Sequence, residues 1–74
     1  MQIAYGISCP VEGYLCDFDI YEGRVVFTRD ITQAMLFDRM QTALIVQRFL
    51  CWVHFKGEKV VGVFPFPHNL RVEV

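Results

Sequence analysis

The chain has 74 residues, of which 54% are hydrophobic and 15% aromatic, and its formal net charge at pH 7 is −1. This length fits one domain, here residues 1–74, and the charge supplies no bulk positive field for nucleic acid, so direct nucleic-acid binding is not expected. The longest apolar runs, 43–46 and 60–66, are far shorter than the roughly 18 residues of a membrane-spanning helix, so no membrane partner is expected.

The N-terminal residues and the cysteines predict a cytoplasmic protein. Residues 1–5 carry no Lys or Arg, so they do not resemble the positive start of a secretory signal. A secreted scaffold this small normally carries an even and denser set of cysteines than Cys9, Cys16 and Cys51. Free, buried thiols are therefore expected.

Three strands are expected in the first part of the chain. Weak alternation predicts a strand at 2–8, and the proline and glycine within 9–13 predict a loop. A second strand is predicted at 14–21, followed by a turn at 22–23. The β-branched and aromatic residues of 24–28 predict the third strand.

Alternation along 14–21 assigns its side chains to two faces. Cys16, Phe18 and Ile20 are expected on one face. Asp17, Asp19 and Tyr21 are expected on the other.

Asp30 is a suitable N-cap for the helical part that comes next. Two arrangements fit: one helix running unbroken to Leu50, or a short helical turn at 31–36 followed by a longer helix at 39–50. The second is favoured, with Asp38 capping the longer helix, because Phe37 and Asp38 interrupt the helical pattern.

A second hairpin is predicted after the helix, from strands at 51–55 and 59–64 around a turn at 56–58. Pro65 and Pro67 confine the residues after this hairpin to an edge strand or irregular chain, and 70–74 is a candidate last short strand. Short turns between strands favour an α+β fold: an antiparallel sheet of four to six strands with one main helix packed on one face, in the order βββαββ with a possible last β.

The helix carries apolar residues on more than one side. Leu36, Met40, Ala43, Leu44 and Leu50 gather on the side expected to pack on the sheet. Ile45 and Phe49 fall among polar residues on the opposite side. Either another segment covers them, or the helix is rotated from this placement, or they form a surface for self-association or a partner, which Tyr21, Trp52 and Phe66 would extend.

Two acidic residues, Asp17 and Asp19, share a strand face at a separation of roughly 6–7 Å. That spacing suits glycosidic acid–base chemistry, but so short a chain offers no deep cleft to desolvate them. Solvated edge charges are favoured, and an acidic strip that docks into a basic protein groove is the other possibility.

Four arginines, Arg24, Arg29, Arg39 and Arg48, flank the junction of third strand and helix. Together they would hold a phosphate or carboxylate, particularly where two subunits combine their sets. Ordinary surface salt bridges with Asp30 and Asp38 are the simpler interpretation.

Cysteine and histidine residues provide four candidate metal ligands in Cys9, Cys16, Cys51 and His54. Zinc needs its ligands to converge, whereas residues three apart on a strand point to opposite faces, so Cys51 and His54 are expected to diverge. Neither a metal, a cofactor nor a catalytic residue is expected.

Residues 27–37, FTRDITQAMLF, followed by Ala43, resemble a pattern found in short, functionally uncharacterised proteins encoded by bacteriophages. In these a strand ends in aromatic-Thr-x-Asp, an alanine and an aromatic come after it, and the next helix carries an early alanine. The resemblance implies a small cytosolic phage accessory protein without catalytic residues. Such proteins bind and block a host component, including defence systems.

Two functions are consistent with these features. The first is a non-enzymatic interaction protein, expected to be a homo-oligomer and most simply a dimer, that inhibits or modulates a host factor. The second is an oligomer that binds an anionic small molecule such as a nucleotide at a subunit interface. In the second, Tyr5, Tyr14 and Trp52 would stack on a base while the arginines hold phosphate.

Overall fold

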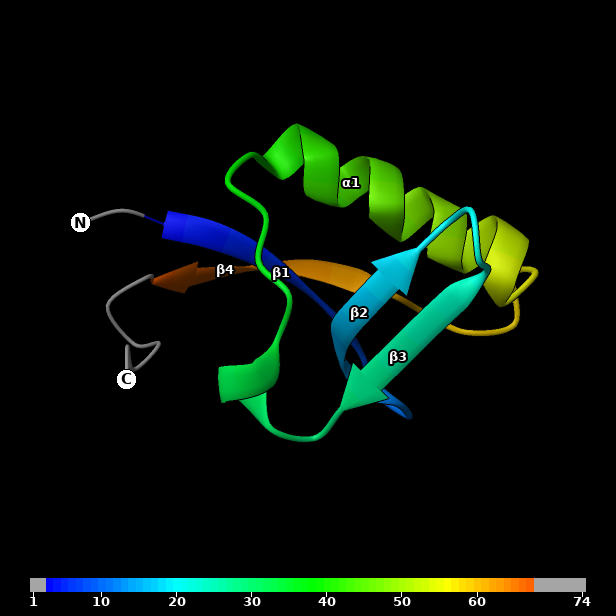
Figure 1. The fold of residues 1–74 in the computed structure, drawn as a ribbon, viewed down its shortest axis with the longest axis horizontal. Helices are drawn as coiled ribbons and strands as arrows, with labels where there is room; N and C mark the ends of the chain where they lie inside the picture. Colours follow the sequence, from blue (N-terminus) through cyan, green and yellow to red (C-terminus); the bar gives the residue numbers. More distant parts are fainter. Residues whose placement is uncertain (1–2, 68–74) are drawn as a thin grey trace.

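A four-stranded antiparallel sheet and one main helix form the molecule (Figure 1). The computed structural model describes residues 3–67, and the candidate strand at 70–74 lies outside them. The elements in chain order are β1 (Ile3–Cys9), β2 (Gly13–Asp19), β3 (Arg24–Thr28), the 3-10 helix η1 (Ile31–Gln33), α1 (Met40–Phe49), the π-helix η2 (Leu50–His54) and β4 (Gly62–Pro67). The sheet order is β3-β2-β1-β4. The predicted α+β class is therefore confirmed, with the order βββαβ in place of βββαββ.

The predicted strand at 51–55 is wrong, and with it the hairpin around 56–58. The chain stays helical after Phe49 and closes with an N–H···O bond of 2.8 Å from Phe55 to Leu50. Lys56 and Gly57 then adopt positive φ of 54° and 78°, which ends the helix in a left-handed turn. Aromatic and β-branched residues favour a strand locally, but Leu50 continues the buried stripe of α1, and its burial keeps the chain helical.

The two-piece helical arrangement is confirmed in outline. Asp30 caps η1, where its carboxylate accepts an N–H from Thr32 at 3.0 Å, although this helix is shorter than the predicted 31–36. The predicted cap at Asp38 is wrong. The N-cap of α1 is Arg39, which makes no capping hydrogen bond through its side chain.

Residues 34–37, between η1 and α1, fill a gap in the sheet. β1 and β2 pair directly at Ser8 with Tyr14 and at their adjoining ends, and then separate. Phe37 exchanges two backbone hydrogen bonds of 2.8 Å with Tyr5 of β1, and the Met35 N–H donates to the Leu15 carbonyl of β2 at 2.7 Å. This segment therefore satisfies backbone groups that the diverging strands would leave unpaired.

The core lies between the sheet and one face of α1, where Ile7, Leu15 and Leu50 are fully buried. A β-bulge between Leu15 and Asp17 changes the phase of β2. Leu15 and Phe18 consequently both reach the core, although simple alternation places them on opposite faces. Ile20, predicted to lie on the strand on the same face as Phe18, lies in the turn after β2 and is 54% exposed.

Two further expectations from the sequence concern the state of the cysteines and the lack of a membrane-spanning helix. All three cysteines are free, with Cys9 buried and Cys16 and Cys51 half-buried. Within residues 3–67, no helix has the length and apolar character needed to cross a membrane.

Candidate protein-binding surface

The side of α1 and η2 that faces away from the sheet carries exposed apolar residues. Ile45 is 69% exposed, Trp52 71% and Val53 58%. At about 100° per residue, Ile45 lies roughly opposite the buried Ala43, and Trp52 is two turns further along the same side. We call Ile45, Trp52 and Val53 the outer apolar face.

Phe49, predicted to be exposed together with Ile45, has a different environment. It is half-buried, and its ring meets that of Phe18 edge-to-face, with centroids 5.3 Å apart. Another part of the chain thus covers Phe49, whereas Ile45 stays open. Phe66, also predicted to extend this surface, is buried in β4, so that prediction is wrong. Phe49 forms the border between the core and the outer apolar face.

The π-helical turn and the turn after it shape the surroundings of Trp52. Gly57 lies close to the indole, because a Cβ built on this glycine would be 3.3 Å from Cζ3 of Trp52. The positive φ of Gly57 also disfavours a side chain there. Glycine at this position therefore leaves room for the indole at the end of the helix.

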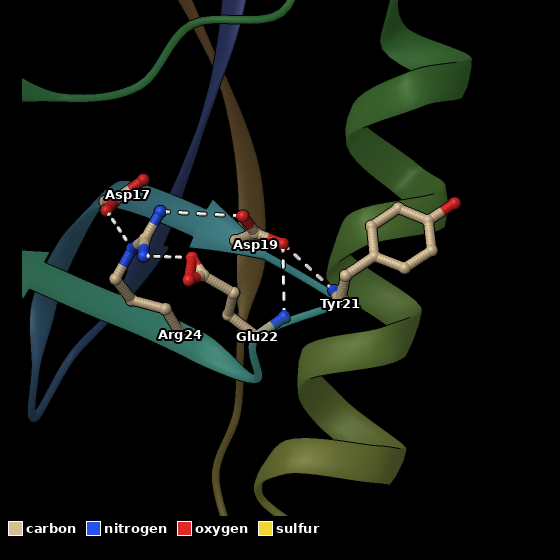
Figure 2. Close-up of polar contacts among 5 residues, drawn as sticks. All are labelled: Asp17, Asp19, Tyr21, Glu22 and Arg24. Carbon is tan, nitrogen blue, oxygen red and sulfur yellow. Dashed lines mark hydrogen bonds and ion pairs between the residues drawn. The ribbon is translucent and has the colours of Figure 1, made fainter.

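The turn between β2 and β3, residues 20–23, carries two further exposed apolar side chains. Tyr21 is 97% exposed and Ile20 54%. The carboxylate of Asp19 accepts the N–H groups of Tyr21 and Glu22 at 3.0 and 3.2 Å, which holds the turn while the tyrosine ring projects outward (Figure 2). Both figures show this turn beside α1, in agreement with the contact between Phe18 and Phe49.

An acidic cluster surrounds one arginine on the same hairpin. Arg24 reaches Asp17 through Nε at 2.6 Å, Glu22 through Nη1 at 2.7 Å and Asp19 through Nη2 at 3.6 Å (Figure 2). The hydrogen bond to Asp17 is the main cause that raises the pKa of Arg24, so the guanidinium stays charged. Three carboxylates share one cation, which leaves this end of the hairpin formally negative.

Asp17 and Asp19 do lie on one face of β2, opposite Val26 and Arg24 of β3. They do not form a free acid–base pair, because both carboxylates contact the Arg24 guanidinium. Their arrangement suits electrostatic recognition of a basic surface better than proton transfer.

The four arginines are spread over several elements. Arg24 and Arg29 flank opposite ends of β3, and Arg29 donates through Nη2 to the Val11 carbonyl at 2.5 Å. Arg39 precedes α1, and Arg48 lies in its last turn. Within one chain, the four arginines therefore do not converge on a shared anion site. The carboxylate of Asp30, suggested above as a salt-bridge partner for an arginine, accepts hydrogen bonds from the N–H and the hydroxyl of Thr32.

The aromatic residues considered for base stacking are similarly separated. Tyr5 pairs with Phe37 inside the sheet, and Tyr14 packs edge-to-face on Phe64 with ring centroids 5.6 Å apart. Trp52 lies on η2.

Cys51 and His54 lie on η2 and not on a strand, so the strand argument for their divergence does not apply. Cys51 Sγ accepts from the Gln47 amide at 3.6 Å, and the His54 ring packs edge-to-face on Phe55. In the part of the chain that the structure describes, His, Cys, Asp and Glu form no group of three or more that could hold a metal.

The loop after η2 is joined to the rest of the molecule by contacts between residues distant in sequence. Lys59 bonds Glu12 at 2.6 Å and lies 5.4 Å from the centroid of the Phe55 ring, which in turn packs against Phe27. The hydrogen bond with Lys59 lowers the pKa of Glu12 and raises that of Lys59. These contacts fasten the loop after η2 to the turn between β1 and β2, and no local sequence pattern announces a pair 47 residues apart.

Val53 and Ile20 belong to the candidate surface but were not among the predicted residues. Val53 was assigned to a strand, and Ile20 to the same face of another strand as Phe18. One signal for Val53 was present in the sequence: Ala43, Val46 and Leu50 form a helical apolar stripe that reaches the last residue before the segment assigned as strand.

Comparison with protein-family models, with curated proteins and with solved structures gives no match to this chain.

Proposed function

We propose that this chain is a small non-enzymatic accessory protein of the bacteriophage type. It binds a host protein, such as a component of host defence, through the outer apolar face and the adjoining turn, and thereby inhibits or modulates that protein. The observation that carries the proposal is the exposure of Ile45 and Trp52 on the side of the helix that faces away from the sheet.

Burial of this surface would release substantial free energy. Exposed single apolar side chains are common on proteins, but an exposed tryptophan beside further apolar residues is typical of interaction sites. Tryptophan is among the residues that most often dominate binding energy, with losses of about 2 kcal/mol or more on truncation. Trp52 and Ile45 are therefore the expected anchors, and Tyr21 adds a second aromatic contact.

The charge beside these anchors defines the kind of partner. Asp17, Asp19 and Glu22 outweigh Arg24 at the hairpin end. Complementary charge steers association and excludes wrong partners. We expect the partner to offer an apolar recess bordered by lysine or arginine side chains.

Capture of the partner needs a probe placed on the surface and a matched probe placed elsewhere. A photo-crosslinking amino acid at position 45 is compared in a bacterial lysate with the same amino acid at position 60. Val60 is 77% exposed in the loop before β4, so it controls for general exposure. A protein crosslinked from position 45 and absent at position 60 is the candidate partner.

Binding of the purified candidate to designed variants then tests the proposal. Ile45→Asp should weaken binding at least about tenfold, because it places a charge in an apolar contact. Val60→Asp should leave the dissociation constant unchanged. Equal affinity of wild type and Ile45→Asp would refute the proposal, as would equal losses in both variants.

A further inference from the structure

The two edges of the sheet differ in their capacity to accept another strand. At the β4 edge, Tyr5 directs its N–H and C=O toward Phe37, which lies on the side of β1 away from β4. The pair of Tyr5 with Pro65 is thus not hydrogen-bonded, and the nitrogen of Pro65 faces the open edge. The backbone nitrogen of Pro67, two residues further along β4, faces the same open edge. Neither proline has an N–H to donate, so this edge is protected.

The β3 edge carries no such protection. The Leu15 carbonyl accepts from Met35 on the side of β2 away from β3. Its partner Phe27 therefore directs its own N–H and C=O outward, and Val25, two residues away, does the same. Within residues 3–67, the outward N–H and C=O groups of Val25 and Phe27 have no hydrogen-bond partner.

The sequence of β3 is suited to pairing with itself. A two-fold axis at Val26 would place Val25 of one copy opposite Phe27 of the other, so that each such pair exchanges two backbone hydrogen bonds. Val25 and Phe27 both pack against the core, so their side chains would extend it across the junction. Val26, 41% exposed, would meet its own copy in the closer, non-hydrogen-bonded position.

The charges are compatible with this register. Arg24 of one copy would lie opposite the uncharged Thr28 of the other, so the paired strands bring no like charges together. Beyond the strand ends, the same register places Gly23 of one copy opposite Arg29 of the other and Glu22 opposite Asp30, so Glu22 would have both the Arg29 cation and the Asp30 carboxylate of the other copy as neighbours.

We propose that β3 pairs antiparallel with β3 of a second copy about an axis at Val26, which joins two sheets into one of eight strands. This dimer goes beyond the proposed binding function, and its axis at Val26 lies outside the outer apolar face. Because α1 packs chiefly on β1 and β4, at the other side of the sheet, the outer apolar face stays available in each copy.

Charged substitutions of Val26, the residue at the two-fold axis, test the proposal, and the molecular mass in solution is the quantity measured. Wild type is expected near twice the 8.6 kDa of one chain in sedimentation equilibrium. Val26→Lys alone and Val26→Glu alone each place like charges face to face, and each should weaken the dimer at least about tenfold. An equimolar mixture of the two variants should restore it as a heterodimer.

Two controls distinguish this interface from a general effect of added charge and from a dimer formed through the outer apolar face. Val60→Lys adds the same charge elsewhere and should leave the dimer intact, and Ile45→Asp should also leave it intact. A monomeric wild type at millimolar concentration would overturn the proposal, and so would a dimer that Ile45→Asp dissolves while Val26→Lys does not. Circular dichroism confirms that each variant is folded, and rescue in the mixture could not come from an unfolded chain.

Discussion

The two faces of α1 place apolar residues in opposite environments. On the inner face, Ala43 and Leu50 are fully buried and Val46 nearly so. On the outer face of the same helix, Ile45 is mostly exposed, and Trp52 is equally open one turn beyond the helix end. Hydrophobic composition alone therefore does not distinguish the residues that hold the fold from those available to a partner.

The difference arises from the surroundings of each face. The inner face packs on β1 and β4, and its burial supplies the free energy that keeps the chain helical through Leu50. In the part of the chain that the structure describes, the outer apolar face is left uncovered. Substitutions on the inner face should consequently change stability, and substitutions on the outer face should change binding.

The largest effect is expected at the inner face. Leu50→Ala removes a fully buried side chain and leaves a cavity, at a cost of about 2–5 kcal/mol in the free energy of unfolding. Urea denaturation monitored by circular dichroism measures this loss. A loss below about 1 kcal/mol would mean that Leu50 is not the core residue described here.

The corresponding outer substitution is Trp52→Ala. We expect the free energy of unfolding to change by no more than about 0.5 kcal/mol, because surface substitutions rarely do more. Affinity for the partner captured at position 45 should fall by about 2 kcal/mol, roughly 30-fold. Titration calorimetry and urea denaturation on the same samples give both quantities, and a variant that loses stability but not affinity would reverse the assignment of the two faces.

A smaller effect is expected where the helix ends. Gly57→Ala forces a Cβ into a left-handed conformation near the Trp52 ring, which should destabilise the protein by about 1–2 kcal/mol. Gly62→Ala is the matched control, because a Cβ there meets nothing within 4 Å. Thermal denaturation should rank Gly57→Ala well below Gly62→Ala, and equal midpoints would contradict the described helix end.

The smallest effect concerns the contact that fastens the loop after η2. The pKa of Glu12 is lowered from 4.5 chiefly by its hydrogen bond with Lys59. As the pH falls below 4.5, this carboxyl therefore takes up a proton more readily in the unfolded chain than in the folded protein. The stabilisation from Glu12 should be complete above that pH and disappear as the pH falls through the folded pKa. The difference in unfolding free energy between wild type and Glu12→Gln should show this dependence on pH. It should become much smaller in a Lys59→Met background, where only the weaker attraction of Arg29 and His54 remains.

Local chemistry predicted several elements of the fold correctly. The strand at 24–28 has its predicted bounds, and Asp30 caps the next turn, because both depend on neighbouring residues. The bulge in β2 and the helical state of 51–54 depend on which residues the core takes up, and neither is encoded in a short window. No bulge was predicted from the sequence, and 51–55 was assigned to a strand.

On the candidate surface too, features set by nearby residues were predicted and features set by distant contacts were not. Ile45, Trp52 and Tyr21 were predicted from their types and spacing, and all three are exposed. Phe49 could not be separated from Ile45 by sequence, because its cover is Phe18, which lies 31 positions earlier in the chain. Val53 was missed because aromatic and β-branched neighbours made its segment look like a strand.

The central claim is that a partner protein covers the outer apolar face, and Trp52 reports on it directly as the single tryptophan of the chain. Incorporation of fluorotryptophan gives one fluorine resonance, whose shift between light and heavy water measures contact with solvent. In the free protein this solvent shift should be large. On binding the unlabelled partner captured at position 45, the resonance should move and the solvent shift should fall sharply. Saturated binding with an unchanged resonance and an unchanged solvent shift would contradict the claim.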